Sequence, residues 1–280
     1  MTKFKTNKKA LAFKGAAVLI IAALLALVFT ACKQPAGAES DGDSSGGGHT
    51  GPNYVKVPYY GLEGYLKYEA LEGEGKVNYI EVIGDIPAAH FKSTSTTEPG
   101  ELGKRIKSFP NKKVALKIEK YPADLTDMEY CFRGCENLIS LANLPEKNIT
   151  NMSGCFSSCK NLTRVPNIPE GVKEMIGCFL FTKLTIGPDI PESVEIMFMC
   201  FTSCSSLQEV RLKCNYNPNE VDGAKAFRSA FANCNALKEG GIKVPSGQLA
   251  AYTDEDAIKI MFGNSCNVDE AKKKFAEYTP

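Results

Sequence analysis

The sequence predicts an α/β solenoid of short parallel strands and helical turns, with an N-terminal β-containing cap and a helical C-terminal end. One sequence pattern recurs five times between residues 127 and 237, and its most regular feature is a Phe that repeats in steps of 24, 23, 22 and 30 residues. A period in the twenties is typical of stacked repeats. Each copy also has too few apolar residues to form a core alone, so neighbouring copies must complete it. The recurring residues are Phe132, Phe156, Phe179, Phe201 and Phe231.

Each copy begins with a predicted helical turn and continues into a predicted strand. In the first copy, Met128, Phe132 and Cys135 stand three or four residues apart, which places them on one side of a helix. An apolar run at 138–141 follows and predicts a short strand. A Pro then ends the unit, because Pro has no N–H with which to extend a ladder of strands.

This repeating sequence pattern resembles that of the BspA-like leucine-rich repeat family. The resemblance is carried by an aromatic Phe, a Cys three residues later, a Leu three residues after that, and a closing Ile-Pro such as 168–169. It covers residues 127–237 and extends to 241–252, which resemble the Ile-x-Val-Pro unit that ends such arrays. The resemblance implies a leucine-rich-repeat solenoid in a surface lipoprotein of the type found in spirochaetes.

We divide the chain into five parts by composition and pattern. A lipoprotein signal peptide is expected at 1–31, and a tether rich in Gly and Ser at 32–53. Residues 54–126 would form the N-terminal cap, 127–240 the repeats and 241–280 the C-terminal capping unit.

The segment before Cys32 has a basic start and an apolar stretch at 16–29, and it ends in Thr30-Ala31-Cys32. This ending looks like a bacterial lipobox, which implies that Cys32 is acylated, for example with palmitate. An uncleaved transmembrane anchor is the alternative. The apolar stretch is short for a bilayer, since a membrane-spanning helix needs about 20 residues.

Outside the repeats, the secondary-structure signals are weaker. Residues 64–68 and 76–82 alternate in polarity, and 72–75 between them predict a hairpin turn. A helix is expected within 99–109 and a strand at 113–118. Residues 256–278 are expected to be helical.

Charge argues against a nucleic-acid partner. Loss of the signal peptide removes five lysines and leaves 28 basic against 32 acidic residues. Phosphate binding needs concentrated positive charge, which this balance lacks.

Ten cysteines other than Cys32 invite three interpretations: a ladder of buried thiols, one or more disulfides between stacked copies, or a metal site. Equivalent residues in stacked strands lie about 4.8 Å apart, within the range of a disulfide. A single copy supplies only a Cys-x-x-x-Cys pair, which is half of a four-ligand zinc site. We favour buried thiols and expect neither a metal nor a cofactor.

Catalytic motifs are scarce, and the chain is not expected to be an enzyme or to take a small-molecule substrate. His49 and His90 are its only histidines, and His49 lies in the tether. We find no Gly-rich phosphate loop and no nucleophile or zinc-protease motif.

Binding is therefore the expected role, through the outward side chains of the repeat strands. A continuous sheet of such strands offers an extended surface. The candidate protein-binding residues are Ile139, Ser140, Thr163, Arg164, Thr185, Gln208, Glu209, Lys238 and Glu239.

The resemblance implies a lipid-anchored protein of the bacterial envelope, at the outer membrane surface, that binds host or neighbouring-cell proteins in adhesion. The alternative is a periplasmic or envelope-assembly scaffold without an adhesive role.

Overall fold

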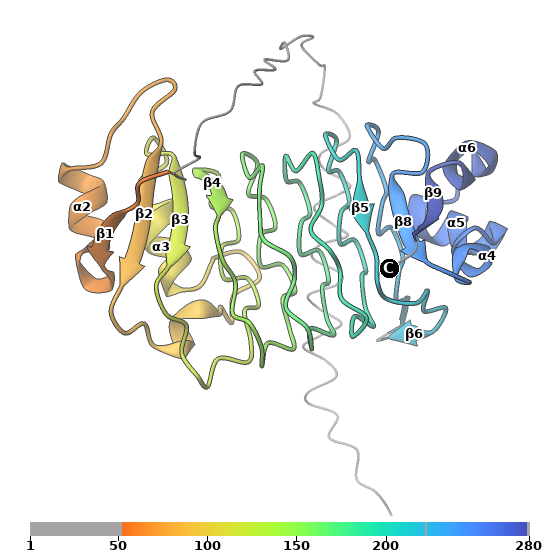
Figure 1. The fold of residues 1–280 in the computed structure, drawn as a ribbon, viewed down its shortest axis with the longest axis horizontal. Helices are drawn as coiled ribbons and strands as arrows, with labels where there is room; N and C mark the ends of the chain where they lie inside the picture. Colours follow the sequence, from red (N-terminus) through yellow and green to blue (C-terminus); the bar gives the residue numbers. More distant parts are fainter. Residues whose placement is uncertain (1–51, 222, 279–280) are drawn as a thin grey trace, which may run out of the picture. The chain divides into compact units, whose positions relative to one another are not determined.

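The computed structural model describes residues 52–221 and 223–278, and residues 54–280 form one compact unit. The expected signal peptide, most of the tether and Cys32 lie outside the described residues. Within the compact unit, turns of chain stack side by side from β1 to β9 (Figure 1). Its strands are β1 Val55–Pro58, β2 Asn78–Ile83, β3 Val114–Ile118, β4 Leu138–Leu141, β5 Val210–Arg211, β6 Glu220–Val221, β7 Ala224–Lys225, β8 Ile242–Pro245 and β9 Phe275–Tyr278.

Parallel pairing joins the units, as the sequence predicts. The first sheet has the order β1-β2-β3-β4 and the second β5-β8-β9, and each neighbouring pair in them is parallel. Between the two sheets, single parallel bridges such as Ser140 to Arg164 and Ile186 to Glu209 continue the row. The antiparallel pair β6-β7 lies in the insertion that lengthens the last step of the repeat.

Short helices lie at both ends of the array. They are the 3₁₀ helices η1 Tyr59–Gly61 and η2 Ala88–Phe91 and the α-helices α2 Leu62–Tyr68, α3 Glu101–Lys107, α4 Leu249–Tyr252, α5 Glu255–Phe262 and α6 Val268–Lys272. The helix predicted within 99–109 is confirmed as α3, and the strand predicted at 113–118 is confirmed as β3.

The predicted hairpin of 64–68 and 76–82 is wrong in its first half. Residues 62–68 form α2, because Leu62 and Leu66 stand four apart and both are fully buried. Residues 78–83 do form a strand, β2, but its partners β1 and β3 run parallel to it.

The C-terminal end is only partly helical. α5 ends where Gly263 adopts a φ of 98°, which a helix cannot continue. After α6, residues 275–278 form β9, and buried Phe275 pairs with Ile242 of β8. The prediction of a helix over the last residues is therefore wrong, because pairing with β8 decides their conformation.

The predicted helical turns of the repeats are not helical. Every second amide of a turn donates a hydrogen bond to the next unit, as the amide of Phe132 does to the carbonyl of Cys155 at 2.8 Å. The amides between them donate within their own turn, as the amide of Cys135 does to the carbonyl of Phe132 at 3.0 Å. A helix would keep all of them inside one segment. Each turn also holds two residues with positive φ, four apart. These pairs are Tyr130 and Gly134, Gly154 and Ser158, Gly177 and Phe181, Met199 and Ser203, and Ser229 and Asn233.

We call the hydrogen bonds between successive turns the turn ladder, and it continues at both ends of the repeats. Gly100 donates to the carbonyl of Tyr130, and α3 packs so closely there that a Cβ on Gly103 would lie 2.2 Å from the carbonyl oxygen of Cys131. At the other end, Ser229 and Phe231 donate to carbonyls at the end of α5. Flanking segments thus supply the backbone partners that another repeat would supply.

The core is a set of ladders that run through the stack. The recurring Phe residues are fully buried, and their rings stack in succession with centroids 5.7, 5.5, 5.2 and 5.7 Å apart. The Met and Cys residues of the same turns are buried beside them. The predicted apolar side of each turn is therefore confirmed as core, although the turn is not a helix.

Candidate protein-binding face

We call the outward side of the parallel row the strand face. It carries the side chains at the first and second positions after the recurring Leu, together with outward residues of β5 and β8. Its residues are Ile139, Ser140, Thr163, Arg164, Thr185, Ile186, Gln208, Glu209, Arg211, Lys238 and Lys243.

Hydrogen bonds between units bring most of the predicted residues together. The amide of Thr163 donates to the carbonyl of Ile139 at 2.9 Å, and its hydroxyl lies 3.1 Å from the same oxygen. The amide of Gln208 donates to the carbonyl of Thr185 at 2.8 Å, and that of Lys238 donates to Gln208 at 3.2 Å. These bonds join the residues in two groups, and the amide of Lys183, which donates to the carbonyl of Leu162 at 3.1 Å, links one group to the other.

Glu239 does not take the place that the spacing predicts. The pairing of Val210 with Ile242 places Gly241, not Glu239, opposite Glu209. A Cβ at Gly241 would lie 2.3 Å from the carbonyl oxygen of Gln208, so the row requires a glycine there. Glu239 is exposed in the preceding turn, because the last repeat holds extra residues before its strand.

The prediction missed several residues of this face. Ile186 is 67% exposed and bridges to Glu209, at the same position after Leu184 that Arg164 holds after Leu162. The third unit is one residue shorter than the others between its Cys and its Leu, which obscured this equivalence. Counting from Leu184 would have found it. Arg211 and Lys243 were missed because the sequence does not show where the row continues into β5 and β8.

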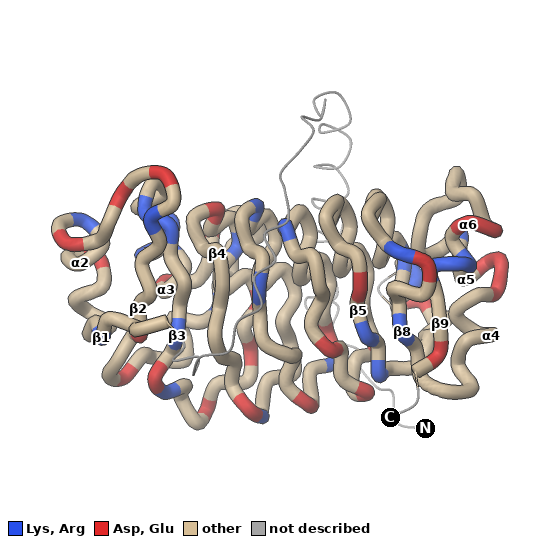
Figure 2. The backbone as a smooth tube through the Cα atoms, turned by 45° about the horizontal axis from the view of Figure 1, so that its top comes forward, with Lys and Arg blue, Asp and Glu red and all other residues tan. Residues whose placement is uncertain are grey.

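Charges differ between the strands and the turns. Figure 2 shows Lys or Arg within β3, β5 and β8, while Asp and Glu gather in turns along the lower rim. Asp189 pairs with Arg211 at 3.5 Å and with Lys213 at 3.4 Å, and Glu209 pairs with Lys238 at 3.2 Å. Such exposed pairs contribute little to stability, but they set the charge that a partner meets.

The repeat cysteines are free thiols arranged in two buried rows. The second row is held by S–H groups that donate to the preceding unit, as Cys159 does to the carbonyl of Phe132 at 2.9 Å and Cys204 to that of Phe179 at 3.0 Å. Thr182 stands in this row in the third unit, 3.3 Å from the sulfur of Cys204. Buried cysteines of this kind behave as small apolar residues.

Burial keeps these thiols protonated. Desolvation raises the pKa of Cys204 and of Cys214 to about 11, and it raises the pKa of Cys155 and Cys178 well above the ordinary value. A protonated thiol is a poor nucleophile and a poor metal ligand. Among the described residues, no cluster of three or more His, Cys, Asp or Glu side chains is placed to hold a metal ion.

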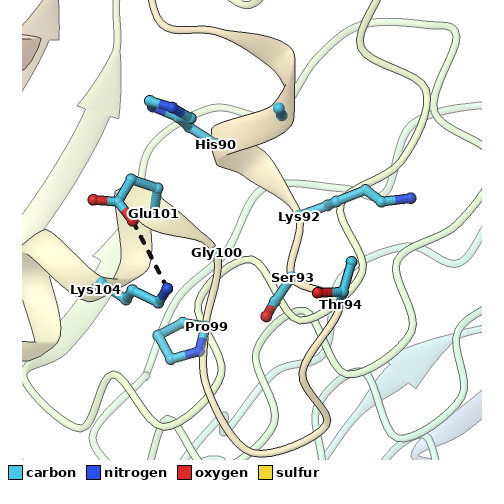
Figure 3. A pocket seen from close by; sticks show the side chains of 9 residues that line it. His90, Lys92, Ser93, Thr94, Pro99, Gly100, Glu101 and Lys104 are labelled. Carbon is cyan, nitrogen blue, oxygen red and sulfur yellow. Dashed lines mark ion pairs between the residues drawn. The ribbon is translucent and has the colours of Figure 1, made fainter.

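A pocket of about 490 Å³ lies between η2 and α3, and it includes the second histidine that the sequence singled out (Figure 3). Nδ1 of His90 lies 2.7 Å from the hydroxyl oxygen of Tyr59. Both lysines that line the pocket have carboxylate partners: Lys104 lies 3.8 Å from Glu101, and Lys92 lies 2.8 Å from Asp127. The lysines of this pocket therefore offer a ligand no unpaired ammonium group.

The expected lipidation site, Cys32, lies outside the described residues. Within the part of the chain that the structure describes, no helix has both the length and the apolar character needed to cross a bilayer.

Comparison with known families supports the repeat assignment. The family model of the BspA type leucine rich repeat region matches residues 128–248 in six copies. No curated protein and no solved structure matches the chain. The matched region spans the stacked turns and the start of the C-terminal segment, and its parallel strands fit a leucine-rich-repeat-like fold. Together, the match and the fold support a BspA-like leucine-rich repeat protein.

Proposed function

We propose that this chain is a lipid-anchored surface protein whose strand face binds other proteins, in adhesion to host or neighbouring cells. The single observation that carries the binding role is the row of outward side chains on stacked parallel strands, in a region that matches leucine-rich repeats. Such repeats suggest protein binding in general. Adhesion is our extension of that role.

A rigid platform suits this task. The turn ladder and the stacked Phe rings run beneath the strand face from one unit to the next. A backbone that is already held by regular hydrogen bonds loses little further freedom when a partner binds, which favours affinity. We further propose that residues 54–126 and 241–280 cap the two ends of the solenoid, where their backbone groups complete the turn ladder.

The anchor in this proposal is Cys32. One acyl chain holds a membrane only marginally, so stable attachment needs two or more. A lipobox cysteine normally receives a diacylglyceryl group, which satisfies this need. Position 32 precedes the compact unit that starts at residue 54, so its replacement should leave the fold unchanged.

The test of the anchor is the Cys32→Ser variant of the full chain. We expect it to move from the detergent phase to the aqueous phase in a detergent-partition assay, with an unchanged melting temperature. A cleaved Cys32→Ser chain that still partitions into detergent would refute lipidation.

The rival role is an envelope-assembly or periplasmic scaffold. Protease added to intact cells distinguishes the two, because it should degrade a surface protein and spare a periplasmic one. Survival of the chain in intact cells, together with its digestion after the outer membrane is opened, would refute surface display and favour the scaffold.

A further inference from the structure

One apolar side chain on the strand face is exposed without an evident structural reason. Six large apolar side chains among the described residues are markedly exposed; five of them lie within residues 55–79, and the repeats contribute Ile186, at 67%. Its neighbours in the same unit, Leu184 and Ile190, are fully buried. Ile186 pairs with exposed Glu209, whose neighbour Val210 is buried, and paired residues of neighbouring strands point to the same side of a sheet, so Ile186 points outward.

The backbone at Ile186 is firmly placed. Ile186 bridges to Glu209, and the next amide, that of Gly187, donates to the carbonyl of Glu209 at 2.7 Å. A Cβ at Gly187 would lie 2.8 Å from Cγ2 of Val210, so the two strands approach as closely as their atoms allow. The exposed Ile186 side chain therefore stands on a rigid base, as the anchor residues of protein interfaces do.

An unpaired cation accompanies it. Arg164 holds the equivalent position one unit earlier, and the adjacent backbones are joined where the amide of Lys183 donates to the carbonyl of Leu162 at 3.1 Å. Neighbouring strands lie about 4.8 Å apart, so Arg164 stands on the strand next to that of Ile186. Glu209 is paired with Lys238 and Arg211 with Asp189, but Arg164 has no ion pair among the described residues and is exposed.

More positive charge lies on the far side of Ile186. Arg211 shares Asp189 with Lys213, so this cluster keeps an excess of one positive charge. Lys243 follows in the next strand, in register with Arg211. A partner centred on Ile186 thus meets net positive charge on both sides.

We propose that the strand face binds a polypeptide segment in which acidic side chains flank an apolar one. The apolar side chain would pack on Ile186, one carboxylate would pair with Arg164, and another would face Arg211 and Lys243. This inference rests on the proposed protein-binding function and specifies the chemistry of the partner. A nucleic acid fits less well, because Glu209 and Asp189 lie among these cations and would repel phosphates, and because a phosphate backbone offers nothing apolar to Ile186.

The test is a selection of random displayed peptides on the immobilised full chain, purified in detergent. We expect the enriched sequences to combine Asp or Glu with a neighbouring Leu, Ile or Phe. One enriched peptide is then synthesised together with a twin in which every Asp and Glu is replaced by its amide. We expect Arg164→Glu, Ile186→Ser and the amide twin each to weaken binding by about tenfold or more, as for loss of an interface anchor.

The matched control is Arg228→Glu, which makes the same charge change at an exposed arginine of the turn ladder. It should leave affinity unchanged, and all three variants should keep the melting temperature, since the replaced side chains are exposed. The proposal is overturned if no sequence is enriched, if the enriched peptides are basic or uncharged, or if Arg164→Glu and Ile186→Ser bind as the wild type does. Binding of a single-stranded oligonucleotide or of anionic lipid vesicles, without binding of the acidic peptides, would also overturn it.

The two proposals can fail independently. Protection from protease in intact cells would refute surface display and leave the peptide result standing. Degradation at the surface together with a failed peptide selection would retain the display of a binding face and refute its preference for acidic segments.

Discussion

Replacing Phe156 by Ala tests whether the stacked rings hold the repeats together. Phe156 lies in the middle of the array and is fully buried. Its ring stacks on Phe132 with centroids 5.7 Å apart and planes 11° apart, and on Phe179 at 5.5 Å and 4°. Truncation removes both ring contacts at once and leaves a cavity between two other rings.

We expect this change to lower the free energy of unfolding by about 3–5 kcal/mol, the usual cost of Phe→Ala in a core. The upper part of this range is expected, because the cavity has little freedom to collapse. The amide of Phe156 donates to the carbonyl of Cys178 at 2.9 Å, and that of Phe132 donates to Cys155 at 2.8 Å. These bonds fix the spacing of the units on both sides of the gap.

The assay is urea unfolding, followed by far-UV circular dichroism and by tyrosine fluorescence, since coincident transitions indicate a single cooperative unit. Tyr68→Ala is the matched control, because that ring is 76% exposed, and its loss should change stability by less than about 0.5 kcal/mol. A loss below about 1 kcal/mol for Phe156→Ala, well under the normal range for a buried Phe, would refute the stacking argument.

Two further predictions concern buried polar groups. In Ser157→Ala, Nη1 of buried Arg133 loses the hydroxyl that accepts its hydrogen bond at 2.8 Å, and we expect the free energy of unfolding from thermal melts to fall by about 1–3 kcal/mol. The control, Ser205→Ala, replaces an exposed hydroxyl and should leave that free energy unchanged. The second concerns pH. The contribution of two buried thiols to stability should be constant below pH 9 and fall between pH 9 and about pH 11, because unfolded thiols ionise near 9.0 while burial raises the pKa of Cys204 and Cys214 to about 11. Cys204→Ala should reduce this slope by up to about 1.4 kcal/mol per pH unit in urea titrations, and an unchanged slope would contradict the effect of burial.

The core of the repeats could be predicted because it depends on the order of residues alone. Met128, Phe132 and Cys135 recur at fixed spacing, and stacking any regular unit brings equivalent side chains together. The departures within the pattern are also absorbed by the stack. Thr182 occupies a place in a row of thiols and bonds to the sulfur of Cys204, so the register survives the shortened third unit.

The strand face could be predicted only in part. Thr163 and Arg164 follow Leu162 in the order expected, and the structure exposes both. Gly241 takes the place predicted for Glu239, because the pairing of β5 with β8 sets the register of the last unit. These strands are about 30 residues apart in the chain, so the spacing within one repeat does not show how they pair. Ile186 was missed for a different reason: the shortened third unit obscured its place two residues after Leu184, which counting from that Leu would have shown.

The sequence by itself determined which residues repeat, which of them are buried, and that neighbouring units must complete one another, because periodic apolar residues need a partner surface wherever the chain runs. Only the tertiary structure decided the conformation of the turns, the helix at α2 and the strand at β9. The physical reason is the destination of the backbone hydrogen bonds. Alternate amides of each turn bond to the next unit, and β9 bonds to β8, so these conformations depend on partners distant in the sequence.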